Sequence, residues 1–392
     1  MIKLADDSIS REDVEKLREW LGTYPHLTMG DKTEEFEEAF SRWQGSRHSV
    51  FVNSGSSANL LMIYALKYKY DINKMAVPAL SWATSVAPLI QLGIEPVLID
   101  CNMDDLSLDL DHLETVLYKN PDIDAVMSIS ALGFIPSMYK LERLCKSYDV
   151  HLIEDNCESI GSRAGTKRPG TWGLMGTYSF YFSHQISTIE GGMIVTDDTE
   201  LYNLLKMLRS HGMSRDADEA TQSTLRKTWN VDDFMDLFTF YVPGFNVRPT
   251  DLQAFIGLEQ LGRLDYIAQC RHENFKIYRD IIERRGMWVP QYAWFDVVSN
   301  LAYPIIVTFD DGSAIPDKRD NIVKRLREND IETRPIIAGS MGDQPFYKEQ
   351  YGEHFLANAD NVQRNGLYVP NHPGLSIPDI QEICRVITSY YD

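Results

Sequence analysis

Short apolar runs alternate with amphipathic stretches between residues 48 and 200. The runs predict strands at 49–53, 75–78, 95–100, 124–128, 151–154, 177–182 and 192–196. Segments 59–68, 83–92 and 139–148 have the 3.6-residue period of helices that cover a sheet. Apolar strands separated by helices are typical of a mostly parallel, doubly wound α/β sheet covered on both faces, and ligands bind such sheets at the carboxyl ends of the strands.

The chain on either side of this region has a different pattern. Ser10 and Asp13 have the spacing of a capping box, which predicts a helix after Ser10, and a second helix fits 32–43. A long helical region is expected over 250–286, with a break near Gly262, followed by strands near 302–308 and 331–336 and helices near 316–329 and 378–390. We therefore expect a large α/β domain over residues 1–250 and a smaller α+β domain, with the long helix, over residues 251–392.

Composition narrows the possible functions. The chain has 57 acidic and 38 basic residues and a formal net charge of −19, which disfavours binding to a nucleic-acid backbone. It has neither a membrane-length apolar run nor the pattern of a signal peptide, so we expect a cytoplasmic protein with no membrane contact. The five cysteines form no CxxC pair, a spacing that favours neither a metal site, an iron–sulfur cluster nor a disulfide framework.

A loop rich in small residues follows the first predicted strand. Residues 53–59 read Asn-Ser-Gly-Ser-Ser-Ala-Asn and open a helix. Backbone amides and hydroxyls at a helix N-terminus can bind one phosphate, with help from the helix dipole. An ordinary capped turn would show the same residues, so the loop alone does not decide between these two interpretations.

Two further side chains are expected near the carboxyl ends of strands. Trp82 could stack on a flat heteroaromatic ligand, although a lone tryptophan is more often part of a core. Asp155 ends an apolar strand, where a buried carboxylate needs a partner. A protonated pyridine nitrogen is one such partner, and an N-cap for the next helix is the alternative.

The stretch from Ser179 to Gly192 gives these separate features a common meaning. Four residues separate Ser179 from His184, and five more separate His184 from Glu190-Gly191-Gly192. The order of serine loop, tryptophan, strand-end aspartate and this stretch resembles the fold type I sugar aminotransferases, which depend on vitamin B6. The resemblance covers essentially the whole chain and includes segments 28–30, 244–249 and 333–335. Segments 59–63, 154–159, 173–177 and 182–192 are most similar to a branch that dehydrates GDP-4-keto-6-deoxy-D-mannose at C3.

The resemblance implies roles for individual residues. Ser56, Ser57 and Ser179 match phosphate contacts of the cofactor, Trp82 the ring stacker and Asp155 the partner of the ring nitrogen. Glu158 is expected near the face of the cofactor. A further set is expected to act between subunits or on the substrate: Asn246, which matches a phosphate contact from a neighbouring subunit, and the substrate-side candidates Arg209, His211, Arg215, Arg248 and Arg334. Gln185 differs from the residue expected beside the base, so no role is assigned to it.

His184 stands where most of that family has the lysine that holds the cofactor as a Schiff base. Imidazole forms no stable aldimine but can still move protons, so the resemblance implies noncovalently held pyridoxal or pyridoxamine phosphate, with His184 as the base. The implied reaction is C3 dehydration of a nucleotide-linked 4-keto-6-deoxy sugar with glutamate as amino donor. It gives 2-oxoglutarate and a 3,6-dideoxy-4-keto sugar for surface polysaccharide. A homodimer with shared active sites is expected.

Three rival functions stay open at this point. One is a related dehydratase with an iron–sulfur cluster, against which the scattered cysteines argue. Another is a 4-aminotransferase, which the missing lysine disfavours. The third is a noncatalytic scaffold, which has no need of Asp155, Trp82 and the serine loop together. Neither the nucleotide nor the size of the sugar, hexose or heptose, is readable from a motif.

Overall fold

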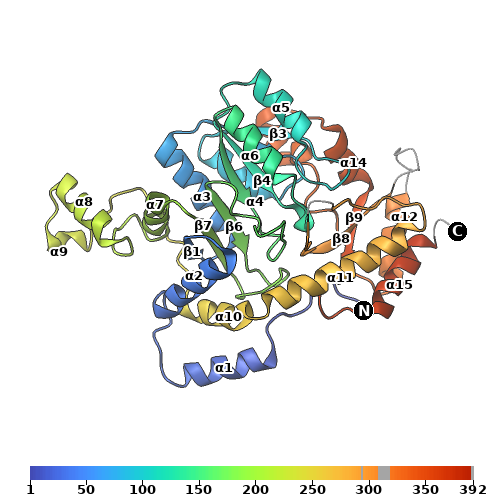
Figure 1. Ribbon diagram of the computed structural model, residues 1–392, viewed down its shortest axis with the longest axis horizontal. Coiled ribbons are helices and arrows are strands. Elements are labelled where there is room, and N and C mark those ends of the chain that lie inside the picture. The colour runs from blue at the N-terminus through green and yellow to red at the C-terminus, as the bar shows by residue number, and fades with distance from the viewer. Residues whose placement is uncertain (293–294, 308–317, 390–392) are drawn as a thin grey trace.

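The computed structural model describes residues 1–292, 295–307 and 318–389 (Figure 1). A seven-stranded sheet has the order β1-β7-β6-β5-β4-β2-β3. β7 is antiparallel to both of its neighbours, and the other strands pair in parallel. The strands are β1 (His48–Val52), β2 (Lys74–Pro78), β3 (Glu95–Ile99), β4 (Ala125–Ile129), β5 (His151–Asp155), β6 (Met175–Ser179) and β7 (Gly192–Thr196). The predicted doubly wound sheet is thus confirmed, including each of its seven expected strands.

Helices cover both faces of this sheet. Side chains alternate between two cores: Val50 and Val52 of β1 belong to one, and Phe51 belongs to the other. α3 packs on β6 and β7 within the first core, whereas α2 and α10 pack together over the aromatic second core. The helices up to this point in the chain are α1 (Arg11–Leu21), α2 (Asp31–Gln44), α3 (Gly55–Tyr70), α4 (Ala83–Gln91), α5 (Leu110–Lys119), α6 (Met138–Ser147), α7 (Thr199–Arg209), α8 (Glu219–Trp229), α9 (Asp233–Asp236) and α10 (Asp251–Leu261).

Helix boundaries follow the sequence signals closely. Ser10 and Asp13 form the predicted capping box of α1. The long helical region is interrupted at Gly262, as expected, so that α10 ends at Leu261 and α11 covers Leu264–Glu283. No helix among the described residues has the length and apolar character needed to cross a membrane.

The C-terminal part corrects one expectation. β8 (Ala302–Ile306) pairs antiparallel with β9 (Gly366–Pro370), whereas the strand expected at 331–336 makes only isolated bridges at Ile331 and Arg334. Pro335 has no N–H to continue a ladder there. The other elements are α12 (Lys318–Glu328), α13 (Pro345–Tyr351), α14 (Ala357–Asn365) and α15 (Ile377–Thr388). The ends of three expected elements lie outside the described residues, at 308, 316–317 and 390.

One segment stands apart from both sheets. In Figure 1, α8 and α9 project from the body of the molecule beyond α7. We call residues 219–240 the arm. Large apolar side chains are exposed along it, namely Trp229, Phe234, Met235, Leu237, Phe238 and Phe240. Soluble chains rarely leave so many large apolar groups together in water without a partner.

Candidate active site

A pocket of about 320 Å³ lies where the strands β4, β5 and β6 end. Both the large sheet and the smaller C-terminal part contribute to its wall. Its lining includes Ser54, Gly55, Ser56, Asn59, Trp82, Ser85, Asp155, Cys157, Glu158, Ser179, Tyr181, Ser183, His184, Glu190, Arg334 and Tyr368. Seven of the predicted site residues are therefore brought together: Ser56, Trp82, Asp155, Glu158, Ser179, His184 and Arg334.

Asp155, the last residue of β5, forms the polar floor of the pocket. Its side chain is buried, and Oδ2 accepts hydrogen bonds from Asn59 Nδ2 (2.7 Å) and Ser85 Oγ (2.8 Å). Oδ1 accepts the backbone N–H of Cys157 at 3.1 Å. A carboxylate offers about four acceptor positions, so these three donors leave capacity for one more. Asp155 caps no helix, and the N-cap alternative is wrong.

The serine loop enters α3 beneath the pocket. Ser54 is the N-cap of α3 and accepts the backbone N–H of Ser57 at 3.0 Å. Gly55 lies so close to Ser179 that an added Cβ would stand 2.6 Å from the Cβ of that serine. The loop is therefore a capped turn that also presents the hydroxyl of Ser56 and the helix N-terminus to the pocket. Ser57 instead turns its hydroxyl to Ser54 (3.0 Å) and is not among the lining residues.

Trp82 precedes α4 and has 56% of its surface exposed. A core tryptophan would be buried, so the interpretation as a core residue is wrong. Trp82 is among the residues that line the pocket, and a flat ring could stack on its exposed side chain.

His184 lies in the loop between β6 and β7. Its backbone N–H donates to the carbonyl of Tyr181 at 2.9 Å, and the two rings meet edge to face with centroids 6.4 Å apart. Nδ1 is buried without a hydrogen-bond partner among the described residues. Burial, followed by the positive charge of Arg271, lowers the pKa of His184 to about 4. The imidazole is therefore neutral at pH 7 and able to accept a proton.

Glu158 lies beside His184 on the wall of the pocket. Its carboxylate accepts the backbone N–H of Leu132 at 2.6 Å. Burial raises the pKa of Glu158 to about 7, against the effect of this hydrogen bond. Gln185, to which the sequence assigned no role, is buried and donates to the carbonyls of Glu158 and Ser299, both at 3.0 Å. It therefore ties the histidine loop to the segment that carries Glu158.

Lysines are absent from the lining of the pocket in the part of the chain that the structure describes. Lys167, the nearest before His184 in the sequence, stacks on Trp172 at 4.1 Å from the ring centroid. Lys206, the next one after it, lies over the ring of Tyr202.

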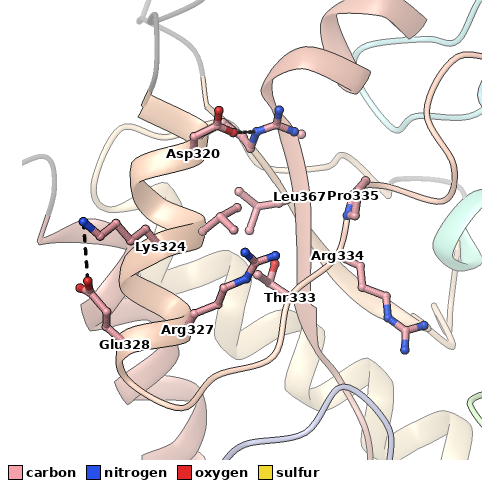
Figure 2. A pocket seen from close by; sticks show the side chains of 11 residues that line it. Asp320, Lys324, Arg327, Glu328, Thr333, Arg334, Pro335 and Leu367 are labelled. Carbon is pink, nitrogen blue, oxygen red and sulfur yellow. Dashed lines mark hydrogen bonds and ion pairs between the residues drawn. The ribbon is translucent and has the colours of Figure 1, made fainter. Parts of the chain in front are cut away.

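Arg334 reaches the pocket from the smaller C-terminal part, with Tyr368 of β9 next to it. A second cavity, of about 570 Å³, lies on the other side of the segment 333–335 and is bordered by α12. Figure 2 shows that the side chain of Arg334 points away from Arg327 and Lys324 of that cavity. Since Lys324 also pairs with Glu328 there, the basic groups of α12 do not extend the pocket around His184.

Besides Ser57, five predicted residues lie outside the pocket. His211, Arg215, Asn246 and Arg248 lie along or next to the segment that leads into and out of the arm. Arg209 requires a correction, because its guanidinium is 2% exposed and makes a buried ion pair with Glu37 at 2.5 Å. It also donates to the carbonyl of Phe51 at 2.8 Å. Arg209 thus joins α7, α2 and β1, and these contacts direct it away from any ligand.

With the geometry in place, comparison with known proteins identifies the family. Residues 7–388 match the DegT/DnrJ/EryC1/StrS aminotransferase family. The chain belongs to this family. The GDP-4-keto-6-deoxy-D-mannose 3-dehydratase of Yersinia pseudotuberculosis is 34% identical over 365 residues, which cover 88% of each chain.

Two crystal structures of GDP-4-keto-6-deoxymannose-3-dehydratase have nearly the same fold. A histidine-to-asparagine variant with bound GDP-perosamine has a TM-score of 0.90 and 30% identity, covering 99% of this chain and 100% of that one. A structure with a trapped PLP–glutamate geminal diamine has a TM-score of 0.89 at the same identity and coverage. The resemblance inferred from the sequence is thereby confirmed.

Sequence reasoning missed several pocket residues of this family member. Asn59 and Ser85 hold Asp155, and Tyr181 and Tyr368 line the walls. Asn59 was readable as a polar position on an otherwise apolar stretch of helix, where it is buried and accepts from Thr177 Oγ1 at 2.6 Å. Tyr368 could not be found in this way, because its strand was not predicted.

Proposed function

We propose that the chain is a B6-dependent dehydratase that removes the C3 hydroxyl of GDP-4-keto-6-deoxy-D-mannose, with glutamate as amino donor. The observation that carries this proposal is a histidine, and no described lysine, beside Asp155 and the serine loop. The relatives at 30–34% identity are dehydratases of this name. The product would be a 3,6-dideoxy-4-keto sugar for surface polysaccharide.

The residues at the pocket fit pyridoxal or pyridoxamine phosphate. Asp155 would accept the protonated ring nitrogen at its free acceptor position, and the exposed ring of Trp82 would stack on the heterocycle. The α3 N-terminus with Ser56, and Ser179 across from Gly55, would hold the phosphate. When bound, the cofactor supplies the electron sink. These contacts are noncovalent, as a pocket with His184 in place of a lysine requires.

His184 would carry the proton transfers. Its neutral imidazole would take a proton from the reactive carbon of the cofactor. The imidazolium would then donate a proton to the C3 hydroxyl, which leaves as water. The sugar gains two electrons at C3, and glutamate supplies them as it becomes 2-oxoglutarate. The amino nitrogen leaves as ammonia when C4 returns to the ketone. The reaction therefore needs no reductant other than glutamate.

The active form would be a homodimer. His211, Arg215, Asn246 and Arg248 lie outside the pocket of their own chain, on segments next to the exposed apolar arm. Docking of the arm on a second copy would bury these apolar groups and bring polar side chains near the pocket of the partner. Shared active sites would explain why only part of the predicted set meets within one chain.

Release of ammonia and 2-oxoglutarate tests the proposal. The enzyme with pyridoxal phosphate and glutamate should release both, in equal amounts, when GDP-4-keto-6-deoxy-D-mannose is added, and dTDP- and CDP-linked 4-keto sugars should react more slowly. Release of 2-oxoglutarate without ammonia would contradict the proposal in favour of an aminotransferase. No turnover across the panel would contradict it in favour of a scaffold.

A further inference from the structure

His184 also borders a third cavity, whose lining includes no residue of the serine loop. This rear cavity, of about 180 Å³, is lined by His184, Gln185, Arg271 of α11, His372 and residues of the N-terminal segment including Asp6. The same histidine therefore separates two spaces: the pocket in front, with Asp155, and the rear cavity, with Arg271.

Arg271 is a buried cation with no counter-ion. Its residue is 4% exposed, and Nη1 donates to the backbone carbonyls of Leu301 (2.9 Å), Asn300 (3.4 Å) and Asn371. The side-chain amide of Asn371 donates to the carbonyls of Arg271 and Asn300, which fixes this arrangement. Within the described parts of the chain, no carboxylate lies within ion-pair distance of Arg271. Burial of a charge that is hydrogen-bonded but not paired with an opposite charge costs folding free energy, so we expect Arg271 to have a role in function.

The other charged groups around the rear cavity do not cancel this charge. Arg263 is neutralised by Asp13, at 2.7 Å. Burial lowers the pKa of His372, which is therefore neutral at pH 7. Asp6 and Asp7 lie at the exposed edge of the cavity, where water weakens their charges. Asp6 raises the pKa of Arg271, against the larger effect of burial, but makes no ion pair with it. The field that reaches His184 from α11 is thus positive.

The pocket in front of His184 is lined by both acidic and basic groups. Three carboxyl groups line this pocket, those of Asp155, Glu158 and Glu190. The raised pKa of Glu158, about 7, leaves it largely protonated in mildly acidic solution. Arg334 adds positive charge from the smaller C-terminal part, beside Tyr368, whose pKa is raised by burial. After burial, the positive charge of Arg271 is the largest cause of the low pKa of His184.

We propose that Arg271 is a positioning residue whose buried positive charge helps to keep the imidazole of His184 neutral between turnovers and makes its protonated form a stronger acid than an ordinary imidazolium. This inference rests on the proposed function. Hydroxide is a poor leaving group, and a stronger acid protonates the departing C3 hydroxyl more completely. A fixed charge held by backbone carbonyls performs this task without moving during the reaction.

Two substitutions separate the charge of Arg271 from its hydrogen bonds. Arg271→Gln keeps a donor and removes the charge, whereas Arg271→Lys keeps both a donor and the charge. The pKa of His184 is measured on cofactor-free protein, from the exchange of the imidazole C2 hydrogen followed by mass spectrometry. It should rise from about 4 toward the ordinary 6.5 in the Arg271→Gln variant and stay near 4 in the Arg271→Lys variant. The exposed His354 is the internal reference and should not change.

Tyr266→Glu provides a second test in case the Arg271 variants fail to fold. Tyr266 is 69% exposed at the rear cavity, so a carboxylate there should be tolerated. Because water weakens its charge, it should raise the pKa of His184 by less than Arg271→Gln does, whereas Tyr266→Gln should leave it unchanged. In the active enzyme, the acid limb of the pH profile of kcat should move upward in the Arg271→Gln variant and return to its wild-type position in the Arg271→Lys variant.

An unchanged pKa of His184 in both Arg271→Gln and Tyr266→Glu would overturn the inference, and so would equal shifts in the Arg271→Gln and Arg271→Lys variants. Because the exchange measurement needs neither cofactor nor substrate, its outcome is independent of whether the proposed reaction is correct.

Discussion

The pocket and the arm are built in opposite ways. In the pocket, the side chain of Asp155 is buried and held by three donors from α3, α4 and its own turn. On the arm, Phe234 and Phe238 are 79% and 66% exposed, and the guanidinium of Arg215 lies over the ring of Phe238, 5.1 Å from its centroid. The floor of the pocket is thus already formed within one chain, whereas the apolar side chains of the arm are left exposed.

This difference shows which function can be assigned to each region. Preformed buried polar groups indicate the chemistry of a ligand, because their partners are already fixed. Exposed apolar groups indicate only that a partner surface exists, and the proposed second copy supplies it. The following predictions test whether the pocket depends on its own chain and the arm on another.

The largest effect is expected at His184. In His184→Lys the amine can form a Schiff base with pyridoxal phosphate, and the geometry for protonating the C3 hydroxyl is lost. Borohydride should then fix the cofactor covalently, and dehydration should fall by about 100-fold or more. Wild-type protein treated in the same way should show no adduct by intact mass. Full dehydration by the lysine variant would contradict the assignment of the base.

Asp155→Asn should have the next largest effect. An amide in place of the carboxylate loses the charge that would match the ring nitrogen, so cofactor affinity should fall by about 10–100-fold. Asp100 is a matched control, because it also follows a strand and accepts two backbone N–H groups, from Asn358 and Ala359. Titration followed by absorbance should show normal affinity in Asp100→Asn. Equal losses in the two variants would mean that the effect is structural.

Charges on the arm should break the homodimer. Phe234→Glu combined with Phe238→Glu places two carboxylates on the apolar surface, which should raise the dimer dissociation constant by roughly 100-fold or more. Sedimentation velocity measures this change. Phe355→Glu, at a residue that is 73% exposed elsewhere on the molecule, should leave the dimer intact. A double variant that stays dimeric would show that the arm serves another partner.

The smallest effect concerns Glu158 and pH. Its folded pKa of about 7 lies above the ordinary 4.5, so folded protein keeps a proton that unfolded protein has lost, and the associated stability disappears as pH rises through 7. Glu158→Gln has no such dependence. Relative to wild type, the variant should gain roughly 1–2 kcal/mol in free energy of unfolding between pH 5 and pH 8. Urea unfolding at both values, with Glu190→Gln as an exposed control, checks this.

Prediction from the sequence was most complete where local patterns decide the structure. The seven large-sheet strands are mostly buried on both faces, and their short apolar runs and flanking turns sufficed. The strand expected at 331–336 failed because Pro335 cannot continue a ladder, although Ile331 and Ile336 are buried in the core as a strand would bury them. β9 was missed because it follows α14 directly. Division at residue 250 stays a prediction, as does the cytoplasmic location.

Prediction of the site also succeeded where local patterns decide and failed where tertiary packing decides. Asp155, Trp82 and His184 were found because each follows a strand in a recognisable order. Arg209 was misplaced, since no local pattern shows that Glu37, 172 positions earlier, neutralises it. Arg271 was not found at all, because a helical arginine looks like a solvated residue until tertiary packing buries it.

The structure of the sugar product tests the central claim most directly. Enzyme, pyridoxal phosphate, glutamate and GDP-4-keto-6-deoxy-D-mannose should give a sugar with a methylene group at C3 and a ketone at C4, identified by mass spectrometry and NMR. A product that retains the C3 hydroxyl and has an amino group at C4 would contradict the assignment of this chain as a dehydratase.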